Sequence, residues 1–206
     1  MEIIEQNYKI LTPINKEVIY SMIELAGRTA YKSEDKITVG SAEKFIKGII
    51  KSGHESVIEH FNISVRFITD RGVTHELVRH RLCAFTQEST RYVNYYKKGM
   101  QFIKPVFWDL DTPFYKQWEY SMLATEGVYN NMISKGAISQ EARSVLPNSL
   151  KTEIVVTANI REWRHILTLR TSKAAHPQII ALMKPLLAEL KEKLPVLFED
   201  IGVEGE

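Results

Sequence analysis

Two stretches with strand patterns, far apart in the chain, constrain the fold more than any other feature. HFNISVRFITD (60–70) alternates Phe61, Ile63, Val65 and Phe67 with polar residues, and TEIVVTANI (152–160) is the best strand pattern in the second half of the chain. Alternation of apolar and polar residues predicts a β-strand with one buried face. In the first stretch the buried face is expected to carry Phe61, Ile63, Val65 and Phe67. Each stretch is followed directly by a helical pattern, which indicates strands covered by helices.

The rest of the chain supplies mainly helical patterns. A short strand is expected over NYKILTP (7–13), and helices over 15–31, 41–53, 72–81, 109–135, 139–147, 161–172 and 177–200. Expected caps are Asn15, Ser41 and Gly53, while Val18 and Met22 are expected on the apolar stripe of the first helix and Phe114, Trp118 and Tyr129 inside the long one. The predicted fold class is α+β, with an antiparallel-type sheet flanked by helices in a single domain, 1–206.

Composition excludes several classes of protein. The 27 basic and 25 acidic residues nearly cancel, so neither nucleic acid nor an anionic membrane is expected as a partner. No apolar stretch approaches the roughly 20 residues that span a bilayer, and MEIIEQNYKI is not typical of a secretory signal. The single cysteine, Cys83, allows no intrachain disulfide. These observations predict a cytoplasmic protein.

Arginine is concentrated in one segment, RHRLCAFTQESTR (79–91). Between Arg66 and Arg91 every lysine or arginine position is an arginine, although lysine outnumbers arginine in the whole chain. The planar guanidinium binds phosphate or carboxylate in a fixed geometry, so this choice indicates an anion site. Ser89 and Thr90 add neutral donors. The alternative is a structural ion-pair network with glutamates of the same region.

HESVIEH (54–60) contains two histidines but is not typical of a metal site. A zincin helix needs His-Glu-x-x-His, and its last position is here Ile58. The inverted motif fails too, because Ser56 stands where its first histidine is required. A loop that lines a polar ligand is the better interpretation, and no metal is predicted.

Further candidate residues lie late in the chain. His165 follows Arg161 by four residues, so the two can share a helical face. Arg170 follows an apolar run, and a buried arginine needs an anion or a polar ligand. A structural ion pair remains the alternative for each of these sites. Cys83 could be an activated thiol, but a small packed residue is the preferred interpretation.

The sequence resembles the flavin-dependent thymidylate synthases. Arg79-His80-Arg81, followed after seven residues by Ser89, matches the RHR-x7-S signature of that family. His54-x-Ser56-x-x-Glu59-His60, DRGVTHELVRHR, TQESTRY, ARSVLP and NIREWRHILTLR also read like family sequence, and the matches extend from about Arg28 to Gln178. The resemblance implies reductive methylation of dUMP to dTMP through FAD. Methylenetetrahydrofolate would donate the carbon, NADPH would be the reductant, and a homotetramer would share its active sites between subunits.

The resemblance also implies site residues. FAD would contact Ser56, Arg79, His80, Arg81, Gln87, Asn159, Arg161 and His165. The substrate dUMP would contact Glu76, Leu77, Val78, Arg79, Gln87, Glu88, Ser89, Thr90, Arg91, Arg143 and Arg170. Arg170 is the expected catalytic residue, facing the uracil ring and favouring ionisation at N3. His165, Gln87 and Glu76 differ from the residues that some relatives carry.

Two other functions fit parts of the pattern. A single-stranded nucleic-acid binder would use the aromatic residues beside the arginines, such as Tyr92, Tyr95 and Tyr96, to stack on bases. The small net charge argues against it. A family member that binds nucleotide and flavin without turnover is also conceivable, but all the required arginines are present.

Overall fold

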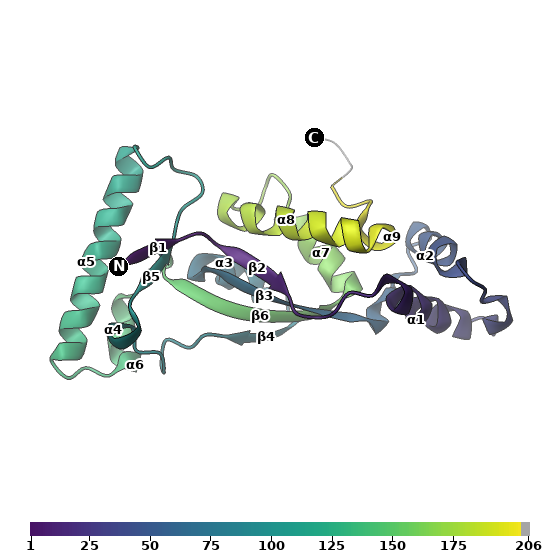
Figure 1. The fold of residues 1–206 in the computed structure, drawn as a ribbon, viewed down its shortest axis with the longest axis horizontal. Coiled ribbons are helices and arrows are strands. Elements are labelled where there is room, and N and C mark those ends of the chain that lie inside the picture. Colours follow the sequence, from purple (N-terminus) through teal and green to yellow (C-terminus); the bar gives the residue numbers. More distant parts are fainter. Residues whose placement is uncertain (203–206) are drawn as a thin grey trace. The chain divides into compact units, whose positions relative to one another are not determined.

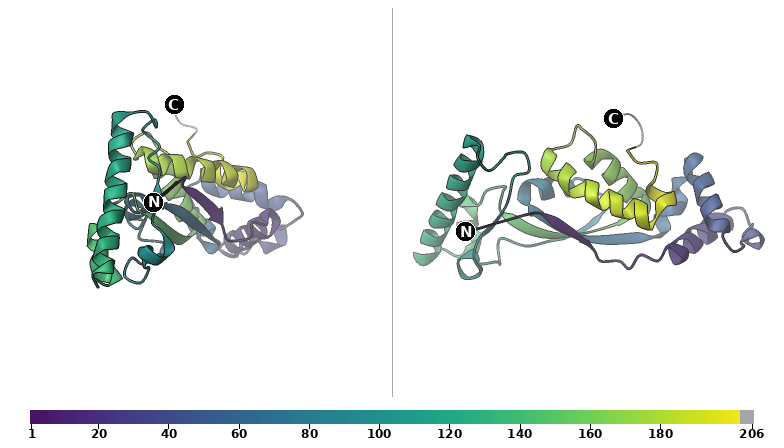
Figure 2. Two further views of the ribbon diagram at one scale, coloured as in Figure 1. Left: turned by 60° about the vertical axis from the view of Figure 1, so that its left-hand side comes forward. Right: turned by 45° about the horizontal axis from the view of Figure 1, so that its top comes forward.

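The computed structural model describes residues 1–202 (Figures 1 and 2). Its strands are β1 (Glu2–Ile4), β2 (Asn7–Ile10), β3 (Asn62–Asp70), β4 (Ala84–Gln87), β5 (Gln101–Ile103) and β6 (Lys151–Asn159). Its α-helices are α1 (Lys16–Thr29), α2 (Ser41–Lys51), α3 (Arg71–Leu77), α4 (Tyr95–Lys98), α5 (Pro113–Ser134), α6 (Ser139–Ala142), α7 (Ile160–Arg170), α8 (Pro177–Lys193) and α9 (Pro195–Phe198). Short 3₁₀-helices are η1 (Glu34–Lys36), η2 (Glu55–His60) and η3 (Arg143–Val145).

The strands form a four-stranded antiparallel sheet of order β2-β3-β6-β4 and a separate parallel pair, β1-β5. The alternation along β3 and β6 buries Ile63, Val65 and Phe67 of the one and Ile154 and Val156 of the other. The α+β class and both principal strands are therefore confirmed. The pair β1-β5 and strand β4 were not predicted.

The chain divides into two compact units, each assembled from separate stretches. Unit 1 comprises Met1–Lys9, Arg66–His80 and Phe85–Val155, and unit 2 comprises Ile10–Val65, Arg81–Ala84 and the chain from Val156 onward. Strands β3 and β6 contribute residues to both units. The single domain stays a prediction.

Unit 1 has an aromatic core against α5. Trp118 and Tyr129 of this helix are buried as predicted, with Tyr95, Phe102 and Leu150 around them. The Trp118 indole donates to Ser149 Oγ at 2.9 Å, and the Tyr129 hydroxyl accepts the backbone N–H of Tyr95. A buried aromatic residue that also satisfies its polar atom fixes its neighbours in place.

The predicted burial of Phe114 is wrong, since its exposed fraction is 64%. Thr112 caps α5 and Pro113 opens it, so Phe114 falls in the first turn. There its ring stacks on Trp108, with centroids 6.2 Å apart, at the surface. The helix itself starts later than the predicted residue 109, because residues 109–112 form the turn that precedes the cap.

In unit 2, helix α1 begins at the predicted cap, where Asn15 Oδ1 accepts the N–H of Val18. Val18 and Met22 are nevertheless exposed, and the prediction that they lie on the buried stripe is wrong. The buried face carries Ile19, Ile23 and a carboxylate, Glu24. A pattern that counts only apolar positions does not identify this buried face correctly, because one of its residues is charged.

Helix α2 also differs slightly from expectation. Its N-cap is Gly40, and Ser41 is the first helical residue, whose hydroxyl donates to the Thr38 carbonyl and to Glu24. Gly53 has φ +69°, as expected for the residue that ends a helix in the left-handed region. The stretch 177–200 is mainly helical as predicted, and it contains two helices: Pro177 opens α8, Pro185 lies inside it and Pro195 starts α9.

Replacing Glu24 by glutamine is expected to lower the free energy of unfolding of unit 2. Its 1%-exposed carboxylate accepts two bonds from Arg28, at 3.1 and 2.9 Å, and one from the Ser41 hydroxyl at 2.8 Å. Losing charge-assisted bonds of this kind costs roughly 1.5–3 kcal/mol. Denaturant unfolding measures the change. Glu43→Gln, which breaks only the exposed ion pair with Lys16, is the control; an equal loss in both variants would contradict the argument.

Among the described residues, no helix combines the length and apolar character that crossing a membrane requires.

Candidate functional site

The arginine-rich segment starts at the end of a short helix in unit 1. Asp70 caps α3 by accepting the N–H of Val73 at 2.7 Å. The helix ends at Leu77, and the next backbone bonds, from Arg79 to Glu76 and from His80 to Leu77, span three residues. Bonds of this type tighten the last turn.

The helix predicted over 72–81 therefore ends earlier than expected, at Leu77, and Arg79 and His80 lie beyond it. Val78, the first residue after the helix, is 38% exposed. His80 is buried and Arg79 is exposed.

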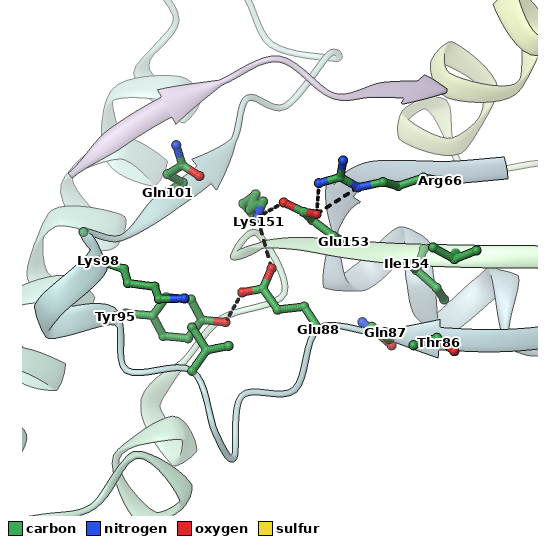
Figure 3. Close-up of a pocket in the computed structure, with 13 residues that line it drawn as sticks. Arg66, Thr86, Gln87, Glu88, Tyr95, Lys98, Gln101, Lys151, Glu153 and Ile154 are labelled. Atoms are coloured by element: carbon green, nitrogen blue, oxygen red, sulfur yellow. Dashed lines mark hydrogen bonds and ion pairs between the residues drawn. The ribbon is translucent and has the colours of Figure 1, made fainter. Parts of the chain in front are cut away.

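Strand β4 follows, and the side chains of Gln87 and of the next residue, Glu88, have different surroundings. The Gln87 amide donates to Thr74 Oγ1 at 2.9 Å and to Thr152 Oγ1 at 3.3 Å, and both hydroxyls belong to buried residues. Glu88 continues the pairing, since its N–H donates to the Glu153 carbonyl at 2.8 Å. The Glu88 side chain points into a cavity of about 600 Å³ within unit 1 (Figure 3).

A chain of charges crosses this cavity. Arg66 of β3 binds Glu153 of β6, and Lys151 of β6 donates to Glu153 at 2.6 Å and to Glu88 at 3.0 Å. The second oxygen of Glu88 accepts the Tyr95 hydroxyl at 3.0 Å. Figure 3 shows the four charged side chains in this alternating order.

These contacts change the acidity of the groups. Burial alone would lower the pKa of Lys151, but its bonds to Glu153 and Glu88 raise it overall. Burial would raise the pKa of Glu153, but the bonds from Lys151 and Arg66 lower it overall. Burial and then the charge of Glu88 raise the pKa of Tyr95. All three therefore hold their ordinary charge states near neutral pH.

The segment after Glu88 turns back on itself. The Ser89 carbonyl accepts the N–H groups of Tyr92 and Val93, both at 3.1 Å, and Ser89 Oγ accepts the N–H of Arg91 at 3.3 Å. The Arg91 guanidinium is exposed and lies 5.5 Å from the centre of the Tyr92 ring. Thr90 is buried. An exposed guanidinium beside a serine is available to an anion.

Unit 2 contains a second cavity, of about 710 Å³, at the start of α7. It brings together Asn159, Arg161 and His165, which were predicted for the flavin. Asn159 caps the helix by accepting the N–H of Glu162 at 2.9 Å. Arg161 donates to Glu59 at 2.6 Å and lies 3.5 Å from Glu55, both in η2.

Sequence analysis did not identify Arg164, which supports this second cavity. Its guanidinium donates to both oxygens of Asp200, each at 2.7 Å, and to the Leu197 carbonyl. It also lies 3.6 Å from Glu55. The bonds from Arg164 lower the pKa of Asp200. Arg164 thereby joins the residues after α9 to η2, the 3₁₀-helix that carries Ser56.

Of the other predicted residues, Ser56 and Arg81 are exposed in unit 2, and Arg170 ends α7, partly buried. Arg143 is exposed in unit 1 at the start of η3. Burial, and then the charge of Glu162, raises the pKa of Cys83 to about 12, which supports a packed thiol over a nucleophile.

The predicted residues divide between the units. Unit 1 holds Glu76, Leu77, Val78, Arg79, His80, Gln87, Glu88, Ser89, Thr90, Arg91 and Arg143, and unit 2 holds Ser56, Arg81, Asn159, Arg161, His165 and Arg170. Most residues predicted for dUMP therefore lie in unit 1. Their common use in one active site stays a prediction.

Known proteins match the chain over most of its length. The family model described as "Thymidylate synthase complementing protein" matches residues 17–196. A flavin-dependent thymidylate synthase of Pyrococcus furiosus is 32% identical over 177 residues, which are 84% of this chain and 72% of that protein. One of Mycobacterium bovis is 34% identical over 202 residues, 89% of this chain and 80% of that protein.

A solved structure shares the fold. The UMP/dUMP methylase PolB from Streptomyces cacaoi, bound with 5-Br dUMP, superposes with a TM-score of 0.82 at 22% identity and covers 97% of this chain and 96% of that one.

Proposed function

Because the chain belongs to the family of thymidylate synthase complementing proteins, we propose that it is a flavin-dependent thymidylate synthase, which methylates dUMP to dTMP. The observation that carries this proposal is the similarity to enzymes of that name over more than four fifths of the chain. The RHR-x7-S signature and the arginines around it supply the charges that the reaction needs.

The turn after β4 fits the substrate's phosphate. Ser89, Arg91 and Arg143 are proposed to hold it, since two guanidinium groups and a hydroxyl can satisfy a dianion in a fixed geometry. Gln87 is proposed to contact dUMP from a fixed position, because its side-chain amide already donates to the hydroxyls of Thr74 and Thr152. The backbone of the next residue is held as well, because the Glu88 N–H donates to the Glu153 carbonyl at 2.8 Å.

The second cavity is proposed to hold FAD. Arg161, His165 and Asn159 line it together with Glu55, Glu59 and Glu162. The guanidinium and amide donors suit a pyrophosphate and the polar edge of a flavin. Arg161 is half exposed, so it can reach an anion while keeping part of its contact with Glu59. Ser56, Arg79, His80, Arg81 and Gln87 are proposed to complete the flavin site. When bound, the flavin would carry electrons between the reductant and the pyrimidine.

The remaining components of the reaction are proposed from the family. Methylenetetrahydrofolate would supply the carbon and NADPH the electrons, and the working enzyme would be a homotetramer in the cytoplasm. Arg170 would face the uracil ring and favour the anion at N3. Glu88 is proposed to contact dUMP, as the resemblance implies, whereas Glu153 would not need to take part, because Lys151 and Arg66 already balance its charge.

The test is a spectrum followed by an assay. The purified protein should show visible flavin absorption that shifts when dUMP is added. It should form dTMP under anaerobic conditions only when dUMP, methylenetetrahydrofolate and NADPH are all present. Flavin binding without dTMP would indicate a binding protein that has lost turnover. A protein that takes up no added FAD would contradict the proposal.

A further inference from the structure

The charged cavity of unit 1 contains Lys151 and Glu153, to which the proposed reaction gives no role, beside Glu88, which is predicted to contact dUMP. Glu88 and Lys151 are 16% and 14% exposed, so both charges are largely withdrawn from water. A mostly buried ion pair has to offset a desolvation cost, and it stabilises a protein little more than a packed apolar pair. A role in positioning explains such a pair better than a role in stability alone.

The contacts of Glu88 join the two ends of one turn. Glu88 stands immediately before Ser89, and Tyr95 stands at the start of α4, just after the turn. The hydrogen bond from the Tyr95 hydroxyl to Glu88 therefore links the residue before segment 89–94 to the residue after it. Within this segment lie Ser89 and Arg91, the proposed phosphate donors.

Lys151 fixes the same carboxylate to the sheet. It donates to the other oxygen of Glu88 and to Glu153, and Glu153 in turn is bound by Arg66. The backbone of Glu88 is held as well, through its N–H bond to the Glu153 carbonyl. Both the main chain and the side chain of Glu88 are thus attached to β6 at the point where the chain leaves the sheet (Figure 3).

From this geometry we infer that Lys151 and Tyr95 are positioning residues for the substrate's phosphate, acting through the carboxylate of Glu88. Neither residue touches the phosphate in this assignment. They hold the turn 89–94 so that Ser89 and Arg91 are presented in one arrangement. The inference rests on the proposed function, because it takes dUMP as the ligand of this turn.

Lys151→Met is the first variant, and dUMP affinity is measured from the shift of the flavin spectrum or by calorimetry. It leaves the Glu88 carboxylate in place without its cation, so the carboxylate should move toward water and displace the turn. Misplacement of reacting groups by about 1 Å can cost up to about 100-fold in rate, and we expect the phosphate donors to be similarly sensitive to their geometry. We expect affinity for dUMP to fall about 10- to 100-fold. Binding of deoxyuridine, which lacks the phosphate, should change less than about threefold.

Lys98→Met is the matched control. Lys98 lines the same cavity and carries the same charge, and among the described residues it has no carboxylate partner. If the cavity only attracts anions by its charge, both variants should lose equal affinity for dUMP. If Lys151 positions the turn, Lys98→Met should bind dUMP within about threefold of the unmodified protein.

Two further variants keep the inference testable if Lys151→Met is damaged. Lys151→Arg keeps a cation that can bond the carboxylates of Glu88 and Glu153, so it should bind dUMP more tightly than Lys151→Met does. Tyr95→Phe removes only the hydroxyl that closes the turn and should weaken dUMP binding while flavin uptake stays intact.

The outcomes separate this inference from the proposed function. If the unmodified protein fails to bind dUMP, the proposed function itself is wrong. If it binds dUMP but Lys151→Met and Tyr95→Phe bind equally well, only the positioning role is overturned. Equal losses in Lys151→Met and Lys98→Met, or a Lys151→Arg variant no better than Lys151→Met, would also overturn it.

Discussion

Arg170→Ala is expected to lower turnover about 100- to 1,000-fold while the protein keeps its flavin. Arg170 is the last residue of α7, where the helix dipole favours a cation. In the proposed site its charge stabilises negative charge that develops on the uracil ring. A fixed charge of this kind acts mainly on the transition state, so kcat should fall more than dUMP affinity. Anaerobic single-turnover measurements of dTMP formation test this directly.

Two variants control for this result. Arg170→Lys keeps the charge but loses the planar fork, so an intermediate rate would indicate that charge and geometry both contribute. Lys173→Ala removes an exposed cation three residues further along and should leave turnover unchanged. If Arg170→Ala releases its flavin and added FAD restores turnover, Arg170 would be assigned to the cofactor site and not to the substrate site.

The main strands could be predicted because burial imposes a simple period on them. In β3 and β6 every second residue is buried, and the sequence follows that alternation over most of β3, from Asn62 to Phe67. The cap of α1 behaves similarly, since Asn15 accepts the backbone N–H of Val18, three residues further along. Signals of this kind are local, so the sequence alone contains them.

Elements whose partners are distant could not be predicted in the same way. Strand β4 is short and pairs with β6, far along the chain, so AFTQ shows only a weak strand pattern. The end of α3 at Leu77 has no glycine or proline to mark it. The buried face of α1 includes Glu24, whose partner Ser41 belongs to the next helix. Tertiary contacts decide each of these cases.

The candidate site shows the same limit. The arginines of the RHR-x7-S segment are visible in the sequence because their type and density are unusual. Lys151, Glu153 and Arg164 are ordinary charged residues in a chain that has many. They become significant only through contacts between segments distant in the sequence, such as Lys151 with Glu88 and Arg164 with Asp200.

Trp163→Ala is expected to produce the largest loss of stability in unit 2. Trp163 is fully buried on α7, and its indole N–H donates to the Ile63 carbonyl of β3 at 2.9 Å. Truncating a buried aromatic residue costs about 3–5 kcal/mol through lost burial and the cavity that remains. Native domains are stable by only about 5–15 kcal/mol, so much of that margin would be lost. Denaturant unfolding at fixed pH measures the change.

The same variant tests how the proposed flavin site is held. Asn159, Arg161 and His165 surround Trp163 in the sequence, and Trp163 attaches their helix to β3. Trp163→Phe keeps most of the buried ring but loses the hydrogen bond, so it should cost only about 1–3 kcal/mol. If α7 needs this anchor to present its polar residues, flavin affinity should fall sharply in Trp163→Ala and only slightly in Trp163→Phe. If Trp163→Ala is folded but destabilised and its flavin affinity is unchanged, the prediction is contradicted. Asn159, Arg161 and His165 would then not hold the cofactor, because α7 would have lost its anchor to β3 with no effect on flavin binding.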